Sequence, residues 1–334
     1  KLIFNPINNL DDNIKSSIIK CLLPNSSRFE SVNEFHQFLT NKKLISHEDV
    51  KREEIKAVIS KKEGEGFKKI AGMDNLKEMI KEEVINPLKD PESHKDYGIE
   101  PPNGVLFYGP PGCGKTFFAE CLSEEIGFNF MKVKPSDVGS KYVHGGKEKI
   151  KELFDSAKEN APTILFLDEI DAMIPDRESG DIGHHYASEV NEWLVQLNNV
   201  GQSDVFIIAA TNKMEKIDSA VLRAGRFDKK ILIAVPDFES RKALFELYLN
   251  IRKKVLSDDL NLDKLSELTN NYVAVDIKLI INDSARKALK NRSKISQEII
   301  EKVIQETTPS VTEKEISRYS ENKGESKNNK NKIG

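Results

Sequence analysis

The segment from Gly109 to Thr116 reads GPPGCGKT and has the residue types of a phosphate-binding loop. Its glycines allow the backbone to curl so that successive N–H groups point towards phosphate oxygens. The ammonium of Lys115 would neutralise phosphate charge, and the hydroxyl of Thr116 would ligate Mg²⁺. An apolar run at 104–108 precedes the segment and a helical stretch at 117–126 follows it, as this motif requires. The alternative is a turn rich in glycine and proline that carries a lysine by chance.

We therefore predict that ATP and Mg²⁺ bind at this loop. The predicted cofactor-binding residues of the loop are Gly109, Pro110, Pro111, Gly112, Cys113, Gly114, Lys115 and Thr116.

Two adjacent carboxylates, Asp168 and Glu169, follow a second apolar run at 163–167. In an α/β protein, ligands bind at the carboxyl ends of the strands. Adjacent residues on a strand point in opposite directions, so the two carboxylates can take different roles. We predict that Asp168 joins Thr116 in holding the metal and that Glu169 is the base that polarises the attacking water. Taken alone, such a pair is more often the start of a solvated loop.

A third buried run, 205–210, ends in Thr211 and Asn212. In a parallel sheet this end would lie beside the two described above, where Asn212 could hydrogen-bond the γ-phosphate or the attacking water. We include Asn212 among the predicted catalytic residues. Asparagine is also common in turns, and that reading stays open.

These residues need a parallel sheet to bring them together. Near-continuous apolar runs separated by helical stretches indicate such a sheet with helices on both faces. The fold class is therefore α/β, a P-loop NTPase sheet over 67–236. The predicted strands are 105–108, 129–133, 163–167, 205–210 and 230–234.

After residue 236 the strands stop and apolar residues recur at helical spacing. One predicted stripe holds Leu244, Leu247, Tyr248 and Ile251, and Thr312 with Glu315 forms a capping box further on. We predict a small, all-helical lid domain over 237–319.

The two ends of the chain differ from these domains. Residues 1–62 carry helical periodicity, and glycines at 64 and 66 predict a boundary, so 1–66 is assigned to a helical N-terminal region and linker. Residues 320–334 contain almost nothing apolar and are predicted to be disordered. The chain begins at Lys1 rather than at methionine, and we expect it to be part of a longer protein.

Composition narrows the classes of function. The 334 residues carry 51 basic and 54 acidic side chains, a net charge of −3, which argues against a dedicated nucleic-acid binder. Three cysteines with no metal-binding spacing favour a reducing, cytoplasmic compartment. No apolar run approaches the length of about 18 residues that a membrane-spanning helix needs.

At this point the chain resembles the AAA ATPases, in the clade of valosin-containing protein, katanin, spastin and the proteasomal ATPases. The likeness covers 67–319. It rests on PPNGVLFYGPPGCGKT at 101–116, APTILFLDEIDA at 161–172, AATN at 209–212 and LRAGRFD at 222–228. The resemblance implies a homo-oligomeric ring, usually a hexamer, with ATP at each interface between subunits.

The resemblance also assigns roles to further residues. Arg223 and Arg226 match paired arginines that project into the neighbouring active site, where a planar, permanently charged guanidinium suits a phosphoryl transition state. On spacing alone they would be surface arginines. Tyr142 and Val143 match a pore loop that grips an extended polypeptide, although a partly buried loop tyrosine is the plainer reading.

Two alanines stand where the family usually has glycine. Ala71 and Ala274 match positions that pack around the adenine base, and the larger side chains would reshape that pocket. His184 and His185 fall at the second pore loop, where we expect a flexible polar loop and no metal.

The function predicted from the sequence is an ATPase that remodels, unfolds or disassembles protein substrates, with adaptor proteins as further partners, by threading them through a central pore. A regulatory switch that assembles with ATP but does not thread is the first alternative. A nucleic-acid-associated motor is the second, and the balanced charge argues against it.

Overall fold

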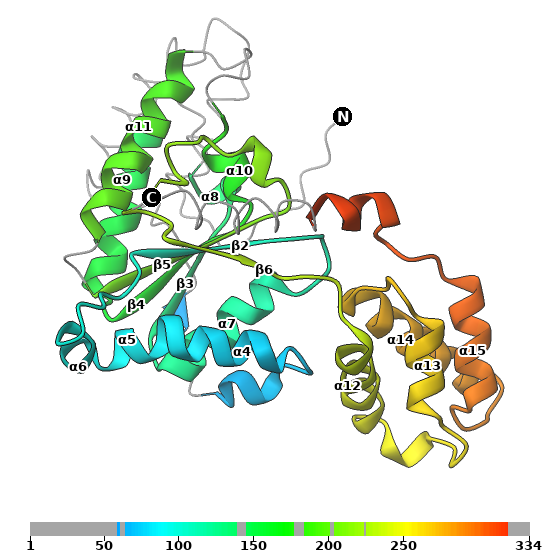
Figure 1. Cartoon of the computed structure of the whole chain (residues 1–334). Helices are drawn as coiled ribbons and strands as arrows, with labels where there is room; N and C mark the ends of the chain where they lie inside the picture. The colour runs from blue at the N-terminus through cyan, green and yellow to red at the C-terminus, as the bar shows by residue number, and fades with distance from the viewer. Residues whose placement is uncertain are drawn as a thin grey trace, which may run out of the picture. The chain divides into compact units, whose positions relative to one another are not determined.

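The computed structural model describes residues 59–60, 64–138, 145–176, 184–200, 204–223 and 225–319 (Figure 1). These residues belong to one compact unit that begins at Ala57. Most of the predicted N-terminal helical region, the predicted disordered tail, Tyr142 and Val143 lie outside the described residues.

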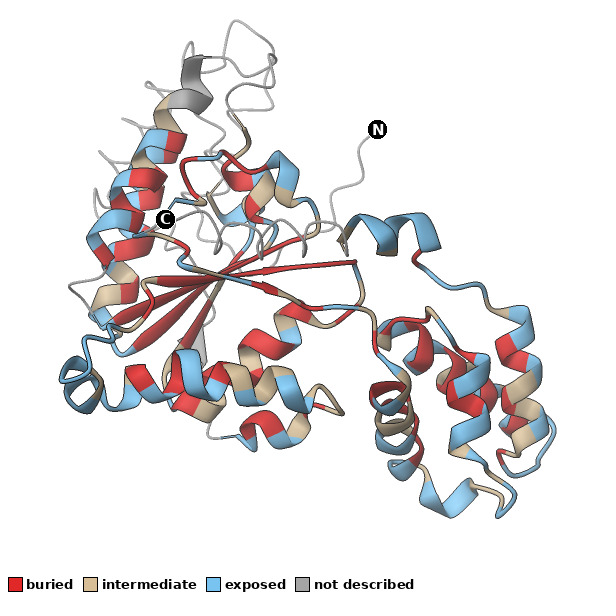
Figure 2. Ribbon diagram, in the orientation of Figure 1, coloured by how far each residue is buried: buried red, intermediate tan, exposed pale blue. Residues whose placement is uncertain are grey.

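The sheet has six strands in the order β1-β3-β4-β5-β2-β6. Its five parallel strands are β2 (Gly104–Tyr108), β3 (Asn129–Val133), β4 (Thr163–Leu167), β5 (Val205–Thr211) and β6 (Lys229–Leu232). Every residue of β2, β4 and β5 is buried, as Figure 2 shows in red. The predicted parallel sheet with both faces covered is confirmed, with strand ends shifted by one or two residues.

The helical prediction for 1–62 is wrong at its end. Ile59–Ser60 forms strand β1, which pairs antiparallel with β3 in the register Ile59↔Met131 and Ser60↔Phe130. The physical reason is that β3 would otherwise leave a row of unpaired N–H and C=O groups at the edge of the sheet, and a short extended segment satisfies them.

Helices cover both faces of the sheet. The chain runs through η2 (Gly66–Lys69), α4 (Asp74–Ile80), η3 (Lys81–Ile85), α5 (Asn86–Lys89), α6 (Pro91–Lys95), α7 (Lys115–Ile126), α8 (Pro135–Val138), α9 (Gly145–Glu159), α10 (Ile170–Met173), α11 (His184–Asn199) and η5 (Met214–Lys216). Helices α9 and α11 pack against each other, with the rings of Phe154 and Trp193 edge to face at 5.8 Å.

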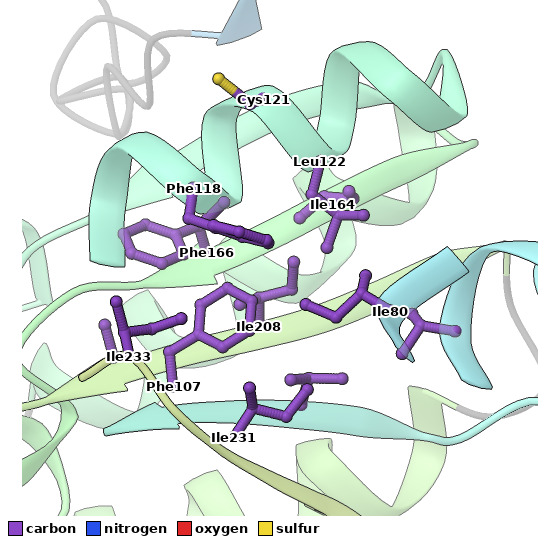
Figure 3. Packing of buried hydrophobic residues seen from close by; sticks show 14 of the residues in the cluster. Ile80, Phe107, Phe118, Cys121, Leu122, Ile164, Phe166, Ile208, Ile231 and Ile233 are labelled. Carbon is purple, nitrogen blue, oxygen red and sulfur yellow. The ribbon is translucent and has the colours of Figure 1, made fainter. Parts of the chain in front are cut away.

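On the other face, α7 lies over the sheet (Figure 3). The ring of Phe118 on α7 meets Phe107 of β2 edge to face at 5.6 Å, and Ile164 and Ile208 extend the same layer along β4 and β5. This packing fixes the amino end of α7 to the end of β2, and the loop between them is therefore held on rigid elements.

The strands give way to helices after β6: α12 (Phe238–Asn250), η6 (Lys253–Val255), α13 (Leu262–Leu268), α14 (Ala274–Lys290) and α15 (Gln297–Glu306). They share a core of their own, which includes Phe245, Ile277 and Ile300. The predicted stripe on α12 is partly wrong, because Leu247 and Ile251 are exposed and the buried face runs through Leu244, Phe245 and Leu249.

The predicted capping box is confirmed. The backbone N–H of Thr312 donates to Glu315 Oε2 at 2.9 Å, and the N–H of Glu315 donates to Thr312 Oγ1 at 3.3 Å. A short terminal helix, residues 313–319, follows this cap. None of the described helices combines the length and the apolar character needed to cross a membrane.

Candidate active site

The loop between β2 and α7 has the backbone geometry that its glycines allow. Gly109, Gly112 and Gly114 have φ angles of 146°, 78° and 93°. A side chain is excluded at Gly109, where a Cβ atom would lie 2.2 Å from the carbonyl oxygen of Ile233. The predicted strand–loop–helix arrangement of 104–126 is confirmed by the structure.

Lys115 is the first residue of α7, and its side chain turns back into the loop. Its Nζ donates to the carbonyl oxygens of Gly109 at 2.9 Å and of Pro110 at 2.7 Å. Burial lowers the pKa of Lys115 to about 8, because a charged ammonium loses its hydration there. The loop thus holds a buried cation at the end of strand β2.

Thr116 and Asp168 are brought together as predicted. The Thr116 hydroxyl donates to Asp168 Oδ2 at 3.2 Å, although 52 residues separate the two in sequence. The two oxygens are hard ligands of the kind that Mg²⁺ prefers. Among the described residues, no cluster of three His, Cys, Asp or Glu side chains could form an all-protein metal site.

Lys132 is a site residue that the sequence prediction missed. Its Nζ lies 3.0 Å from the same Oδ2 atom of Asp168. Lys132 is one residue from the end of β3, and β3 neighbours β4 with Lys132 opposite Phe166. The signal available in the sequence was a lysine near the carboxyl end of a predicted strand, but its partner depends on the register of two strands.

Glu169 occupies an unusual backbone conformation. Its φ and ψ are 57° and 48°, in the left-handed region, at the residue that precedes α10. Its side chain is exposed and makes no hydrogen bond or ion pair with any other described residue. Left-handed backbone in a residue other than glycine costs about 1–3 kcal/mol and concentrates at functional sites. The turn separates the Glu169 carboxylate, which has no partner among the described residues, from that of Asp168, which contacts Thr116 and Lys132.

Asn212 lies just after the end of β5. Tyr108 pairs with Thr211, which places Asn212 level with Gly109, the first residue of the loop. Leu167 pairs with Ala209, which places Asp168 on the same edge of the sheet. The Oδ1 atom of Asn212 is buried and has no hydrogen-bond partner among the described residues.

The start of α14 touches the phosphate-binding loop. The N–H of Val275 donates to the carbonyl oxygen of Gly112 at 3.4 Å, and the side chain of Val273 lies 2.8 Å from where a Cβ of Gly112 would be. Ala274, between these two residues, and Ala71 both pack partly buried against the helical core. The structure brings Ala274 to the loop.

Cys113 lies inside the loop, and its side chain is buried. It is 2% exposed, and burial raises the pKa of its thiol to about 12. A thiol must be accessible and deprotonated to react readily. Cys113 has neither property in this structure, so its thiol is not set up to react.

The two predicted arginines belong to the loop that leads into β6. Arg223 is exposed, while Arg226 donates from Nε to Asn198 Oδ1 at 2.9 Å and from Nη1 to the carbonyl oxygen of Ala220. Asp228, two residues after Arg226, accepts hydrogen bonds from the backbone and side chain of Asn103, just before β2 begins.

This places Arg226 near the amino ends of the strands, and the phosphate-binding loop lies at their carboxyl ends. The five residues of β2 separate the two ends by about 16 Å. The structure therefore does not bring Arg226 to the loop of its own chain.

Comparison with known proteins adds the family. Residues 105–235 match the model of the family described as "ATPase family associated with various cellular activities (AAA)". The chain contains an AAA domain. The matched range runs from β2 to just beyond β6 and includes the loop at 109–116, both carboxylates and Asn212.

Similar proteins match a longer part of the chain than the family model does. The chain is 39% identical over 226 residues to the cell division cycle protein 48 homolog of Archaeoglobus fulgidus, covering 67% of this chain and 30% of the relative. It is 39% identical over 238 residues to the proteasome-activating nucleotidase of Saccharolobus solfataricus, covering 69% and 59%. It is 38% identical over 224 residues to protein SAV of Sulfolobus acidocaldarius, covering 66% and 28%. The chain thus spans less than two thirds of each relative.

Two predictions about the AAA domain concern residues that the structure does not place. Tyr142 and Val143, the predicted substrate-binding pair, lie outside the described residues. The flexible loop expected at His184 and His185 is wrong, because their backbone begins α11; their side chains are not described. The roles of Tyr142 and Val143 stay predictions.

Proposed function

We propose that this chain hydrolyses ATP with Mg²⁺ and uses the energy to remodel, unfold or disassemble protein substrates. The observation that carries the proposal is the meeting, at the carboxyl ends of the strands, of a buried lysine in a glycine loop, a threonine–aspartate pair and a glutamate that has no side-chain partner among the described residues. Lys115 and Thr116 begin α7, Asp168 and Glu169 follow β4, and each has the chemistry that phosphoryl transfer needs.

Each residue has a distinct part in this proposal. The backbone N–H groups of 109–116 and the ammonium of Lys115 bind the β- and γ-phosphates. Thr116 and Asp168 would hold Mg²⁺, which when bound neutralises charge that develops on the phosphate oxygens. Glu169 accepts a proton from, or orients, the attacking water. Asn212 offers to the same region its Oδ1, which has no hydrogen-bond partner in the described part of the chain.

The position of Arg226 supports a homo-oligomeric ring, which we propose to be a hexamer. Arg226 lies about the length of β2 away from its own loop, so it can assist hydrolysis only at the site of a second copy. Arg223 is exposed on the same loop and is available for the same contact. A guanidinium inserted from a neighbour stabilises the charge of the transition state.

Protein substrates are favoured by the relatives. One is named a proteasome-activating nucleotidase, and its similarity to this chain extends over 238 residues. We propose protein substrates, with adaptors as further partners, and threading through a pore lined by Tyr142 and Val143. A cytoplasmic location fits the buried cysteines Cys113 and Cys121, neither of which forms a disulfide.

The substitution Glu169→Gln tests the proposed chemistry. We expect it to leave ATP affinity within about twofold and to lower turnover by at least about 100-fold, because the amide cannot accept the proton of the attacking water. Glu152→Gln, a change of the same kind on the exposed face of α9, should hydrolyse ATP normally. Full turnover by the Glu169→Gln protein would remove Glu169 from the mechanism.

Threading is tested separately with a folded reporter protein that carries an unstructured tag. Tyr142→Ala should keep ATP hydrolysis and lose ATP-dependent unfolding of the reporter. Normal unfolding by this variant would rule out threading through this loop and favour a switch.

A further inference from the structure

The terminal helix, residues 313–319, connects the helical domain back to the AAA domain (Figure 1, red). The segment before it is held by Asp276 at the start of α14, whose carboxylate accepts hydrogen bonds from the N–H and the hydroxyl of Ser310. Val311 is 2% exposed and belongs to the core beneath the sheet, and Ile316 packs against that core. Both ends of this connection are thus fixed.

The last described residue of this helix contacts the predicted catalytic strand end. The hydroxyl of Tyr319 donates to the backbone carbonyl oxygen of Asn212 at 2.6 Å. The side chain is partly buried, and burial raises the pKa of Tyr319, so its phenol stays a hydrogen-bond donor across the physiological range. The Tyr319 hydroxyl is separated from Asn212 by 107 residues of sequence.

Asn212 needs a positioning contact of this kind. Its Oδ1 is buried without a partner in the part of the chain that the structure describes, so no hydrogen bond of that atom fixes the amide group. The hydroxyl of Thr211, the residue before Asn212, donates to Asp171 Oδ1 at 2.7 Å and accepts from the N–H of Lys213 at 2.8 Å. The N–H of Lys213 and the carbonyl of Asn212 belong to the same peptide, so Thr211 Oγ1 and the Tyr319 hydroxyl hold this peptide from its two sides. Fixing this peptide restricts the direction in which the Asn212 side chain leaves the backbone.

We propose that Tyr319 is a positioning residue for ATP hydrolysis, which holds the carbonyl of Asn212 so that its side chain points at the reacting phosphate. This inference rests on the proposed function and deepens it. The helix that carries Tyr319 is joined through Ser310 and Asp276 to α14. The helical domain therefore contacts the site in two places: α14 contacts Gly112 in the loop, and Tyr319 contacts Asn212.

Tyr319→Phe removes the hydroxyl and keeps the ring. We expect kcat for ATP to fall about five- to tenfold, as for the loss of one neutral hydrogen bond that aligns a catalytic group, while KM and the dissociation constant for ATP change less than about twofold. Tyr272→Phe is the matched control, because Tyr272 also donates to a backbone carbonyl oxygen, that of Thr307 at 2.5 Å, within the helical domain. It should alter the melting temperature at least as much and leave kcat unchanged.

A double-mutant cycle separates positioning from general stability. Asn212→Ala keeps the backbone carbonyl but removes the side chain, so adding Tyr319→Phe to it should lower kcat no further. A fivefold loss in both backgrounds, or an unchanged kcat in Tyr319→Phe alone, would overturn this role while leaving the proposed function intact. A folded wild-type protein without ATP turnover would overturn the proposed function and this role together.

Discussion

Lys115 carries a charge in a place where hydration is mostly lost. Only 9% of its surface is exposed, and two carbonyl oxygens are its direct partners. Buried charge of this kind is unfavourable for folding unless an ion pair compensates it. The loop therefore holds a cation at a cost in stability, and a bound phosphate would offset that cost.

The pH dependence of this effect has a definite sign. The pKa of Lys115 is lowered from 10.5 to about 8 in the folded protein, so between pH 8 and 10.5 the unfolded chain binds the proton and the folded chain does not. Stability rises with pH wherever the unfolded state binds more protons, so this group makes the free energy of unfolding rise from pH 8 towards 10.5. Below pH 8 its destabilising effect is fully present.

We expect Lys115→Met to be more stable than the wild type at pH 7, by up to about 3 kcal/mol, and to lack this rise above pH 8. Urea unfolding between pH 7 and 9.5, in buffer with EDTA and no nucleotide, measures both effects. Lys151→Met, on the exposed face of α9, should behave as the wild type does. A Lys115→Met protein less stable than the wild type at pH 7 would contradict this account of the loop.

At the scale of single residues, the sequence predicted groups that the structure places at the carboxyl ends of the strands, and their catalytic roles stay predictions. Lys115, Thr116, Asp168 and Glu169 stand in motifs that require them. The ion pair of Asp168 with Lys132 was missed, because it depends on which strands are neighbours, and local sequence does not state that.

At the scale of elements, strands and helices were predictable wherever burial imposed a long pattern. Continuous apolar runs identified β2, β4 and β5 because both faces of these strands are covered. Strand β1 has only two residues, and its pairing with β3 stabilises it. Two residues are too few to show a periodic pattern in the sequence. The exposure of Leu247 and Ile251 was missed for a related reason, since helical spacing gives a face but not its width.

The first turn of α14 depends on a buried carboxylate. Asp276 is 2% exposed, and it accepts from the N–H of Val273 and from the N–H and the hydroxyl of Ser310. Asp276→Ala would leave these donors buried without partners. We expect it to lower the free energy of unfolding by about 2–4 kcal/mol.

Asp283→Ala is the control for this prediction. Asp283 lies on the same helix and makes a partly exposed ion pair with Arg286, whose loss should change stability by no more than about 0.5 kcal/mol. Chemical denaturation of the two variants measures the difference. Equal effects would show that the hydrogen bonds of Asp276 do not hold the terminal connection.

At the scale of the whole molecule, the account requires more than one copy of the chain. Each copy would carry Glu169 at one end of its sheet and its arginines near the other, so a complete site would combine two copies. Contacts between copies depend on surfaces, which a motif in one chain does not specify. The resemblance to the AAA ATPases made the arginines candidates, and the fold places Arg226 near the amino ends of the strands.

Mixing two inactive variants tests this arrangement. Glu169→Gln keeps its arginines, and Arg223→Ala keeps its glutamate, so a mixed ring contains some interfaces with both groups intact. We expect each variant alone to lose most of its ATP turnover and the mixture to regain a measurable fraction. A mixture no more active than the sum of its components, in rings shown to contain both, would place both groups in a site made by one chain.

The central claim is that the loop at 109–116 binds ATP through Lys115, and calorimetric titration with ATP·Mg²⁺ tests it most directly. We predict that the wild-type chain binds about one ATP per copy and that Lys115→Met, although folded and at least as stable, loses at least about 100-fold in affinity, as expected when a buried charged partner of the phosphates is removed. Lys151→Met should bind as the wild type does. A folded wild-type chain that binds no ATP, or a Lys115→Met chain that binds it equally well, would contradict the claim.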